Sequence, residues 1–295
     1  MCISDKGLRS LRIKIGGISF AITLNKPKDY HIFEKIYHEF FTNDDPNIIL
    51  QVNHKEMPDL NGWKKVFDSG SVWCLWQSNN MWAISLHSPL LEPSIYQLVI
   101  LDSAFERGEI YIRKIPSGES SFPFEYALAE VLTVILLAMG RGVLMHACAI
   151  KDGETGRLFV GTSGAGKSTT ARIWASQESA QILCDDRVIL RKHEGRFWMY
   201  GTPWHGDVHA VSSKAVPLEQ IFILRHASKN SATLLKPADA VSQLFVRTFP
   251  TFWDNAGINF TLEFLAEMSL AVPCNDLGFV PDQSAVDFVR ELTPT

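Results

Sequence analysis

The first 115 residues alternate mostly as β-strands do, with one helical segment among them. In residues 29–41 (DYHIFEKIYHEFF), apolar side chains recur at the i, i+3, i+4, i+7 spacing of an amphipathic helix. Later segments alternate with a period of two, and QSNN at 77–80 lies between two of them, which predicts a hairpin. We therefore expect a β-rich α+β N-terminal domain over residues 1–120.

The remainder of the chain, residues 121–295, mixes strands and helices. The turn-rich IPSGESS at 115–121 is the predicted linker. The apolar run at 126–140 predicts a buried helix, because it contains Glu130 and is shorter than the roughly 20 residues that span a bilayer. Asp-Gly at 152–153 between two apolar strands predicts a second hairpin. Strand, loop, helix and strand follow, an order that favours an α/β fold class.

A glycine-rich loop precedes the helix of this α/β layer. Gly161, Gly166, Lys167 and Ser168 match the G-x-x-x-x-G-K-[ST] pattern of phosphate-binding loops. Glycine lets backbone N–H groups turn inward around a phosphate, and the helix dipole favours the same anion. The lysine reaches the outer phosphates, and the serine hydroxyl can bind Mg²⁺. The predicted ATP-binding residues are Gly161, Thr162, Ser163, Gly164, Ala165, Gly166, Lys167, Ser168 and Thr169.

Two adjacent carboxylates, Asp185 and Asp186, lie in the apolar segment 181–192 that is predicted as the next strand. Successive side chains of a strand point to opposite faces, so both can reach one site only at a bulge or a strand end. Beside a phosphate loop, we interpret one as a Mg²⁺ ligand and the other as the acceptor of a proton from an attacking hydroxyl. The alternative is a solvated strand end in which one aspartate bonds Arg187.

Other polar positions are ambiguous from their spacing. His146 lies in an apolar strand, where a lone histidine is more often a satisfied core residue. The segment GTPWHGD at 201–207 is either an active-site loop or an ordinary turn. Arg172, Arg187 and Arg225 are candidates for holding transferred charge, although each is more often a surface or ion-pair residue.

Composition narrows the classes of function. The 295 residues have a net charge of −4, which disfavours general nucleic-acid binding because that requires a basic face. The five cysteines are dispersed, as in reduced cytosolic proteins. Charges in residues 1–17, where a signal peptide needs an apolar run, disfavour secretion. We expect a cytoplasmic protein with no nucleic-acid or membrane partner.

The run HACAIKDGETGRLFVGTSGAGKSTTARIW…ILCDDRVIL resembles the catalytic domain of HPr kinase/phosphorylase. That family shares its P-loop core with ATP-dependent phosphoenolpyruvate carboxykinase, and its pattern is a histidine-bearing strand, a hairpin, the phosphate loop and an Asp-Asp strand. The resemblance is close over residues 140–210 and does not extend to the N-terminal half. It implies an HPr kinase/PEP carboxykinase-like P-loop core within residues 121–295.

The resemblance also implies roles for single residues. Lys167 would bind the β-phosphate, Asp185 would act on the attacking serine hydroxyl, and His146 would lie beside the site. These three form the expected catalytic set. Ser168 and Asp186 would hold Mg²⁺.

The sequence departs from the family pattern at two places. Thr169 replaces a glutamate common in the family, and GTPWHGD replaces a glycine-rich signature, with Asp207 standing in for its acidic metal ligand. Both departures disfavour HPr itself as the substrate. The segments DDRVILR, YGTPWHG and LGFVPDQSAVDFVR are closer to the HPr-kinase-like serine kinases of modified-peptide gene clusters.

The expected activity is therefore ATP- and Mg²⁺-dependent transfer of the γ-phosphoryl group to a serine hydroxyl of a peptide or small protein. We expect the N-terminal domain to recruit this acceptor, and the resemblance favours a homo-oligomer. Two alternatives stay open. One is a nucleotide-dependent switch or NTPase without an acceptor, in which Asp185 positions water. The other is a kinase of a small molecule such as free serine.

Overall fold

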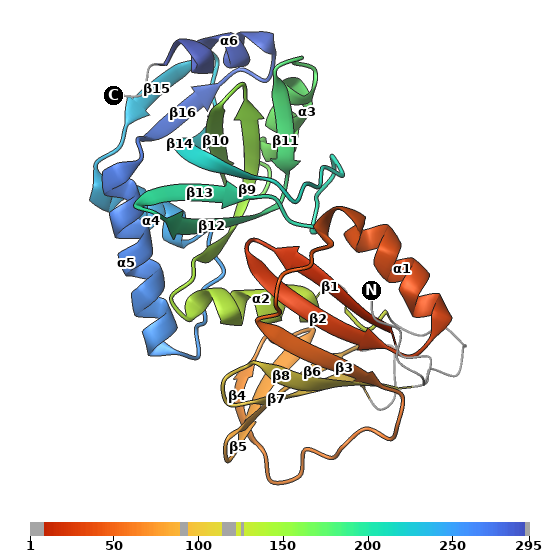
Figure 1. Ribbon diagram of the computed structural model, residues 1–295. Coiled ribbons are helices and arrows are strands. Elements are labelled where there is room, and N and C mark those ends of the chain that lie inside the picture. The colour runs from red at the N-terminus through yellow and green to blue at the C-terminus, as the bar shows by residue number, and fades with distance from the viewer. Residues whose placement is uncertain (1–8, 89–93, 114–121, 125–126, 293–295) are drawn as a thin grey trace. The chain divides into compact units, whose positions relative to one another are not determined.

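The computed structural model describes residues 9–88, 94–113, 122–124 and 127–292 (Figure 1). It divides into two compact units, residues 1–133 and 134–295, which we treat separately. The predicted linker at 115–121 lies outside the described residues. The apolar run that follows it contains α2 (Leu128–Ala138). Within the described part of the chain, no helix has the length and apolarity needed to cross a membrane.

Unit 1 is an eight-stranded sheet with the order β1-β2-β3-β8-β7-β6-β5-β4. The predicted amphipathic helix is α1 (Pro27–Tyr37), followed by the short 3-10 helix η1 (His38–Phe40). Asn79 and Asn80 join β5 to β6, which confirms the hairpin predicted at 77–80. The strands are β1 (Arg9–Ile15), β2 (Ile18–Leu24), β3 (Ile48–Asn53), β4 (Lys64–Asp68), β5 (Trp73–Ser78), β6 (Met81–His87), β7 (Ile95–Asp102) and β8 (Arg107–Ile112).

Unit 2 contains a second eight-stranded sheet and four helices of its own. The strands are β9 (Val143–Asp152), β10 (Thr155–Val160), β11 (Ala180–Cys184), β12 (Arg187–His193), β13 (Arg196–Tyr200), β14 (Ala215–His226), β15 (Ser231–Leu234) and β16 (Cys274–Phe279). The helices are α3 (Lys167–Ala175), α4 (Pro237–Phe245), α5 (Asn255–Ala271) and α6 (Gln283–Glu291). The predicted Asp-Gly hairpin joins β9 to β10.

The long strands β9 and β14 connect two parts of this sheet. One part has the order β11-β9-β10-β14-β16-β15, and the other joins β9 to β14 through β12 and β13. Strands β10, β14 and β16 are parallel, while β9 is antiparallel to both β10 and β11. The carboxyl ends of β10, β11, β14 and β16 therefore meet at one edge, where ligands of α/β sheets usually bind.

The predicted single strand over 181–192 is wrong, because it breaks at Asp185 and Asp186 into β11 and β12. The pairing of β11 with β9 shifts register between Ile182 and Cys184, just before the break. In a regular strand, Asp185 and Asp186 would point to opposite faces of the sheet. Because the strand breaks at these residues, both carboxylates can reach the same edge of the sheet.

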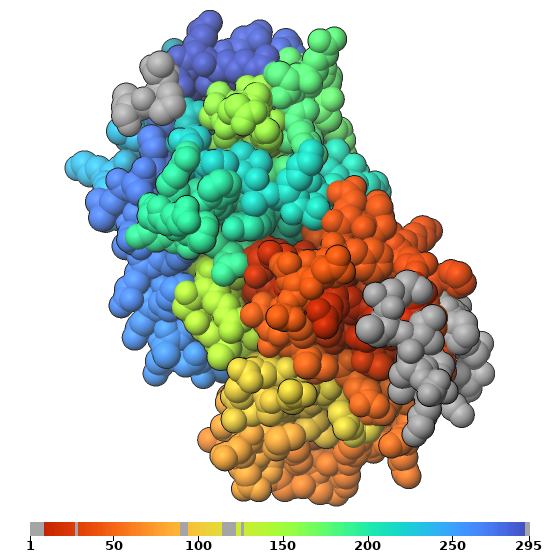
Figure 2. All heavy atoms as spheres, viewed as in Figure 1, coloured from red at the N-terminus to blue at the C-terminus, as the bar shows by residue number. Residues whose placement is uncertain are grey.

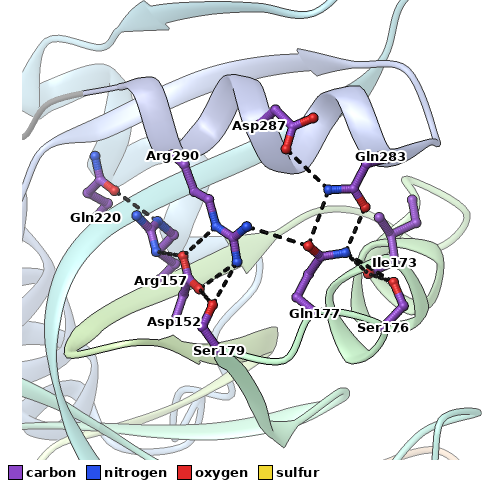
Figure 3. A network of polar contacts seen from close by, with 10 residues as sticks. All are labelled: Asp152, Arg157, Ile173, Ser176, Gln177, Ser179, Gln220, Gln283, Asp287 and Arg290. Carbon is purple, nitrogen blue, oxygen red and sulfur yellow. Dashed lines mark hydrogen bonds and ion pairs between the residues drawn. The ribbon is translucent and has the colours of Figure 1, made fainter.

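A buried ionic network fixes the helix that follows the phosphate loop (Figure 3). Asp152, at the end of β9, accepts hydrogen bonds from Arg157 of β10, Arg290 of α6 and Ser179, at 2.7–3.0 Å. Both guanidinium groups also lie over the ring of Trp174, at 5.5 and 5.3 Å from its centroid. The network ties α3 to the β9–β10 hairpin and to α6, whose atoms form part of the outer surface in Figure 2.

Candidate active site

The predicted phosphate loop, Gly161–Ser168, connects β10 to α3 at the shared sheet edge. Gly164 and Gly166 have φ angles of 78° and 104°, which favour glycine. A Cβ on Gly166 would lie 2.5 Å from Cζ of Phe279, the last residue of β16. Glycine is thus required here both by backbone conformation and by the close approach of a neighbouring ring. The expected loop between a strand and a helix is present.

Lys167 is 7% exposed and reaches back into this loop. Its Nζ donates hydrogen bonds to the carbonyl oxygens of Gly161, at 2.9 Å, and Thr162, at 3.2 Å. Burial lowers the pKa of Lys167, the charge of Asp186 acts in the opposite sense, and the charge of Arg247 adds to the lowering. The two carbonyl contacts hold the Lys167 amino group inside the loop.

Asp185 is 2% exposed and holds the segment after β13. Its Oδ1 accepts a hydrogen bond from the Gly206 amide at 2.9 Å, and its Oδ2 accepts one from the Val208 amide at 2.8 Å. A Cβ on Gly206 would lie 2.9 Å from Oδ2 of Asp185, so this contact needs glycine. Asp185 therefore fixes the loop that carries Asp207.

Asp186 points to a different group of partners. Its Oδ1 lies 3.0 Å from Nε2 of His146, and its Oδ2 accepts a hydrogen bond from Arg187 at 2.8 Å. Burial raises the pKa of Asp186, but the hydrogen bond from His146 and the charges of Arg187, His146 and Lys167 outweigh it, so this pKa lies below its ordinary value. The Asp186 carboxylate is ionised at neutral pH.

The segment GTPWHGD forms a loop over this site. Asp207 is largely exposed, and its Oδ2 lies 3.9 Å from an Nη atom of Arg172 on α3. His205 and His209 approach each other within 3.1 Å at their Nδ1 atoms. The loop, which the sequence left undecided between an active-site loop and a turn, lies beside the carboxylates.

One cavity of about 460 Å³ collects these groups. All six of the predicted catalytic and metal-binding residues line it, together with Arg172 and most of the phosphate loop. Its lining residues are His146, Ser163, Gly164, Gly166, Lys167, Ser168, Thr169, Arg172, Asp185, Asp186, Gly206 and Asp207. Of the nine predicted ATP-binding residues, Gly161, Thr162 and Ala165 belong to the loop but do not line the cavity.

The donors in this cavity fit a magnesium ion better than a softer metal. Ser168, Asp186 and Asp207 offer oxygen atoms, which Mg²⁺ prefers, and Mg²⁺ usually takes its remaining ligands from water and substrate phosphates. The described residues contain no cluster of three or more His, Cys, Asp or Glu side chains suited to a metal ion. Any Mg²⁺ here would therefore depend on the nucleotide for part of its coordination.

Arg247 is a candidate that the sequence pattern did not reveal. It follows α4, and its carbonyl oxygen accepts a hydrogen bond from the His146 amide at 2.8 Å. Its Nε is buried and, among the described residues, has no hydrogen-bond partner. Arg187 lies nearby, over the ring of Phe249 at 4.5 Å. Its Nη1 donates hydrogen bonds to Gln243, and Arg247 is not among the residues that line the cavity. No motif surrounds Arg247, so only the pairing of its segment with β9 brings its charge near Lys167.

The three arginines proposed from the sequence differ in position. Arg172 lines the cavity, and Arg187 bonds Asp186. Arg225 instead pairs with Asp276 of the neighbouring strand β16. The structure therefore brings two of the three to the candidate site.

No protein-family model and no curated protein matches the chain. Among solved structures, the chain is similar to the Hpr(Ser) kinase/phosphatase from Coxiella burnetii, with 14% sequence identity and a TM-score of 0.29. The match covers 50% of this chain and 93% of that one.

Proposed function

We propose that unit 2 is an ATP- and Mg²⁺-dependent phosphotransferase that moves the γ-phosphoryl group to a serine hydroxyl of a peptide or small protein. The observation that carries the proposal is the single cavity shared by the phosphate loop, Asp185, Asp186 and His146. Phosphoryl transfer needs a phosphate cradle, positive charge and a proton acceptor within reach of one another. This cavity offers all three.

In this proposal the chain's own groups bind and orient the substrates. Loop amides and Lys167 hold the β- and γ-phosphates, and Arg247 neutralises charge that develops during transfer. Bound Mg²⁺, held by Ser168, Asp186 and Asp207, would neutralise further phosphate charge. His146 and Arg187 orient the Asp186 carboxylate.

The proton of the attacking hydroxyl needs an acceptor. Each Asp185 oxygen already accepts one backbone N–H, but a carboxylate has about four lone-pair sites, so Asp185 keeps acceptor capacity on its cavity side. The serine oxygen forms a bond to the γ-phosphorus, the bond from that phosphorus to the β–γ bridging oxygen breaks, and ADP leaves. The serine proton passes to Asp185.

The test follows γ-labelled ATP with Mg²⁺, a panel of serine-containing peptides, and free serine. We expect labelling of a peptide by the wild type and none by Lys167→Ala. Lys151→Ala, a change at a partly exposed lysine bonded to Glu154, is the matched control and should label normally. Labelling of free serine in place of peptides would favour a small-molecule kinase. Release of free phosphate with every acceptor would favour an NTPase and contradict the kinase proposal.

A further inference from the structure

Three parallel strands of unit 2 end beside the phosphate loop. Strand β10 leads into the loop, β14 ends at His226, and β16 ends at Phe279. Strand β14 lies between β10 and β16 (Figure 1). His226 and Phe279 are paired residues of their two strands. Ligands of α/β sheets bind outside such carboxyl ends. The two rings therefore lie on the ligand-binding edge.

His226 is held in a defined orientation at this edge. Its Nε2 lies 3.0 Å from the carbonyl oxygen of Gly164, which can only accept, so the imidazole donates this hydrogen bond. Its ring stacks on Phe279, with centroids 5.6 Å apart and planes 28° from parallel. Phe279 is 2% exposed, whereas His226 is exposed. One side of the imidazole is thus supported by an aromatic ring, and the remainder faces solvent.

The site's other groups set the direction in which a nucleotide would lie. Asp186 follows β11 and His146 belongs to β9, both on one side of β10. Strands β14 and β16 lie on the other side of β10. A nucleoside triphosphate whose terminal phosphate faces Asp186 would therefore extend its nucleoside toward β14 and β16.

We propose that His226 forms a nucleoside subsite, in which its exposed face stacks on the purine base of ATP. The subsite rests on the proposed function, because it requires a nucleotide on the phosphate loop. Aromatic and imidazole rings stack on nucleic-acid bases without needing a specific hydrogen-bond pattern. The hydrogen bond to Gly164 holds the ring beside the loop, which aligns base and phosphates.

The test compares binding of Mg²⁺-ATP and of Mg²⁺-tripolyphosphate, which lacks the nucleoside, by isothermal titration calorimetry. For His226→Ala we expect the Kd of ATP to rise about 10-fold, as for loss of one base-stacking contact, while the Kd of tripolyphosphate stays unchanged. Equal weakening of both ligands would mean that His226 only supports the loop, and would overturn the subsite. An unchanged Kd for ATP would overturn it as well.

A second variant separates stacking from the hydrogen bond. His226→Phe keeps a ring and loses the donor to Gly164, so we expect it to keep the preference for ATP over tripolyphosphate. Loss of that preference would contradict the proposal.

His193→Ala, at an exposed histidine at the end of β12, is the control and should change neither Kd. A wild type that binds tripolyphosphate as well as ATP would overturn the subsite alone, whereas binding of neither would overturn the proposed function with it.

Discussion

Asp186 and His146 form a close pair across two strands, with 3.0 Å between Oδ1 of the carboxylate and Nε2 of the imidazole. Asp186 lies in the break between β11 and β12, and His146 lies in the half of β9 that pairs with β12. Arg187, which is paired with His146 in the sheet, bonds the second carboxylate oxygen. The pair is therefore built from neighbouring strand positions and not from neighbouring sequence.

Asp186→Asn should lower the rate of phosphoryl transfer by about 100-fold, because it removes the charge of a carboxylate that we assign to Mg²⁺ binding. The pKa of Asp186 is below its ordinary value, so the wild type is ionised at neutral pH and the variant lacks a charge that is normally present. Initial rates with labelled ATP would measure this. Asp45→Asn, at a fully exposed carboxylate, is the control, and equal rates for both variants would contradict a role for Asp186.

Arg247→Ala should lower kcat by about 10- to 100-fold and change the KM for ATP less, because we assign its charge to the transition state. Arg247→Lys should restore part of the rate, since it keeps the charge. Steady-state kinetics would measure both parameters. A rise in KM with unchanged kcat would instead indicate that Arg247 only binds the ground state. Arg196→Ala, at an exposed arginine paired with Glu219, should behave as the wild type.

Gly166→Ala should lower the free energy of unfolding by about 1–3 kcal/mol and weaken nucleotide binding, because the φ of 104° and the 2.5 Å contact with Phe279 both oppose a Cβ. Chemical denaturation and calorimetric titration would measure the two effects. Gly195 also has a positive φ, of 76°, but a Cβ added there would have no atom within 4 Å, so Gly195→Ala is the control. That control should lose some stability and keep nucleotide binding.

Asp152→Asn should lower the free energy of unfolding by about 2 kcal/mol at pH 7, because it leaves the buried Arg157 without its charged partner. Burial raises the pKa of Asp152, but hydrogen bonds from Arg290 and Ser179 and the charge of Arg157 outweigh it, so the folded-state pKa is below the unfolded value. This stabilisation is present above the unfolded-state pKa and is lost as the pH falls through the folded-state pKa. The difference between variant and wild type should therefore shrink in acid.

Denaturant titrations at pH 7 and at successively lower pH would test this dependence. Arg290→Ala should cost less than Asp152→Asn, since the Arg290 side chain is about one third exposed and its loss leaves the Asp152–Arg157 pair intact. A stability difference that does not change with pH would show that packing, and not charge, accounts for the loss.

The local sequence was enough to predict several features of this protein. The amphipathic helix α1, the hairpins at 77–80 and 152–153, and the loop between β10 and α3 all depend on residues close together in the chain. Hydrophobic periodicity and turn-forming residues determine such elements, because their hydrogen bonds join near neighbours. The phosphate chemistry that the short glycine-rich motif indicates stays a prediction.

Only the tertiary structure decided which distant residues share the site. The break between β11 and β12, the two backbone amides bound by Asp185, and the positions of Arg247 and His226 depend on pairing between segments far apart in the chain. No local pattern encodes these contacts, since strand register and close packing arise from the whole fold. The sequence by itself determined that a glycine-rich loop stands between a strand and a helix, whereas the fold determined which side chains surround that loop.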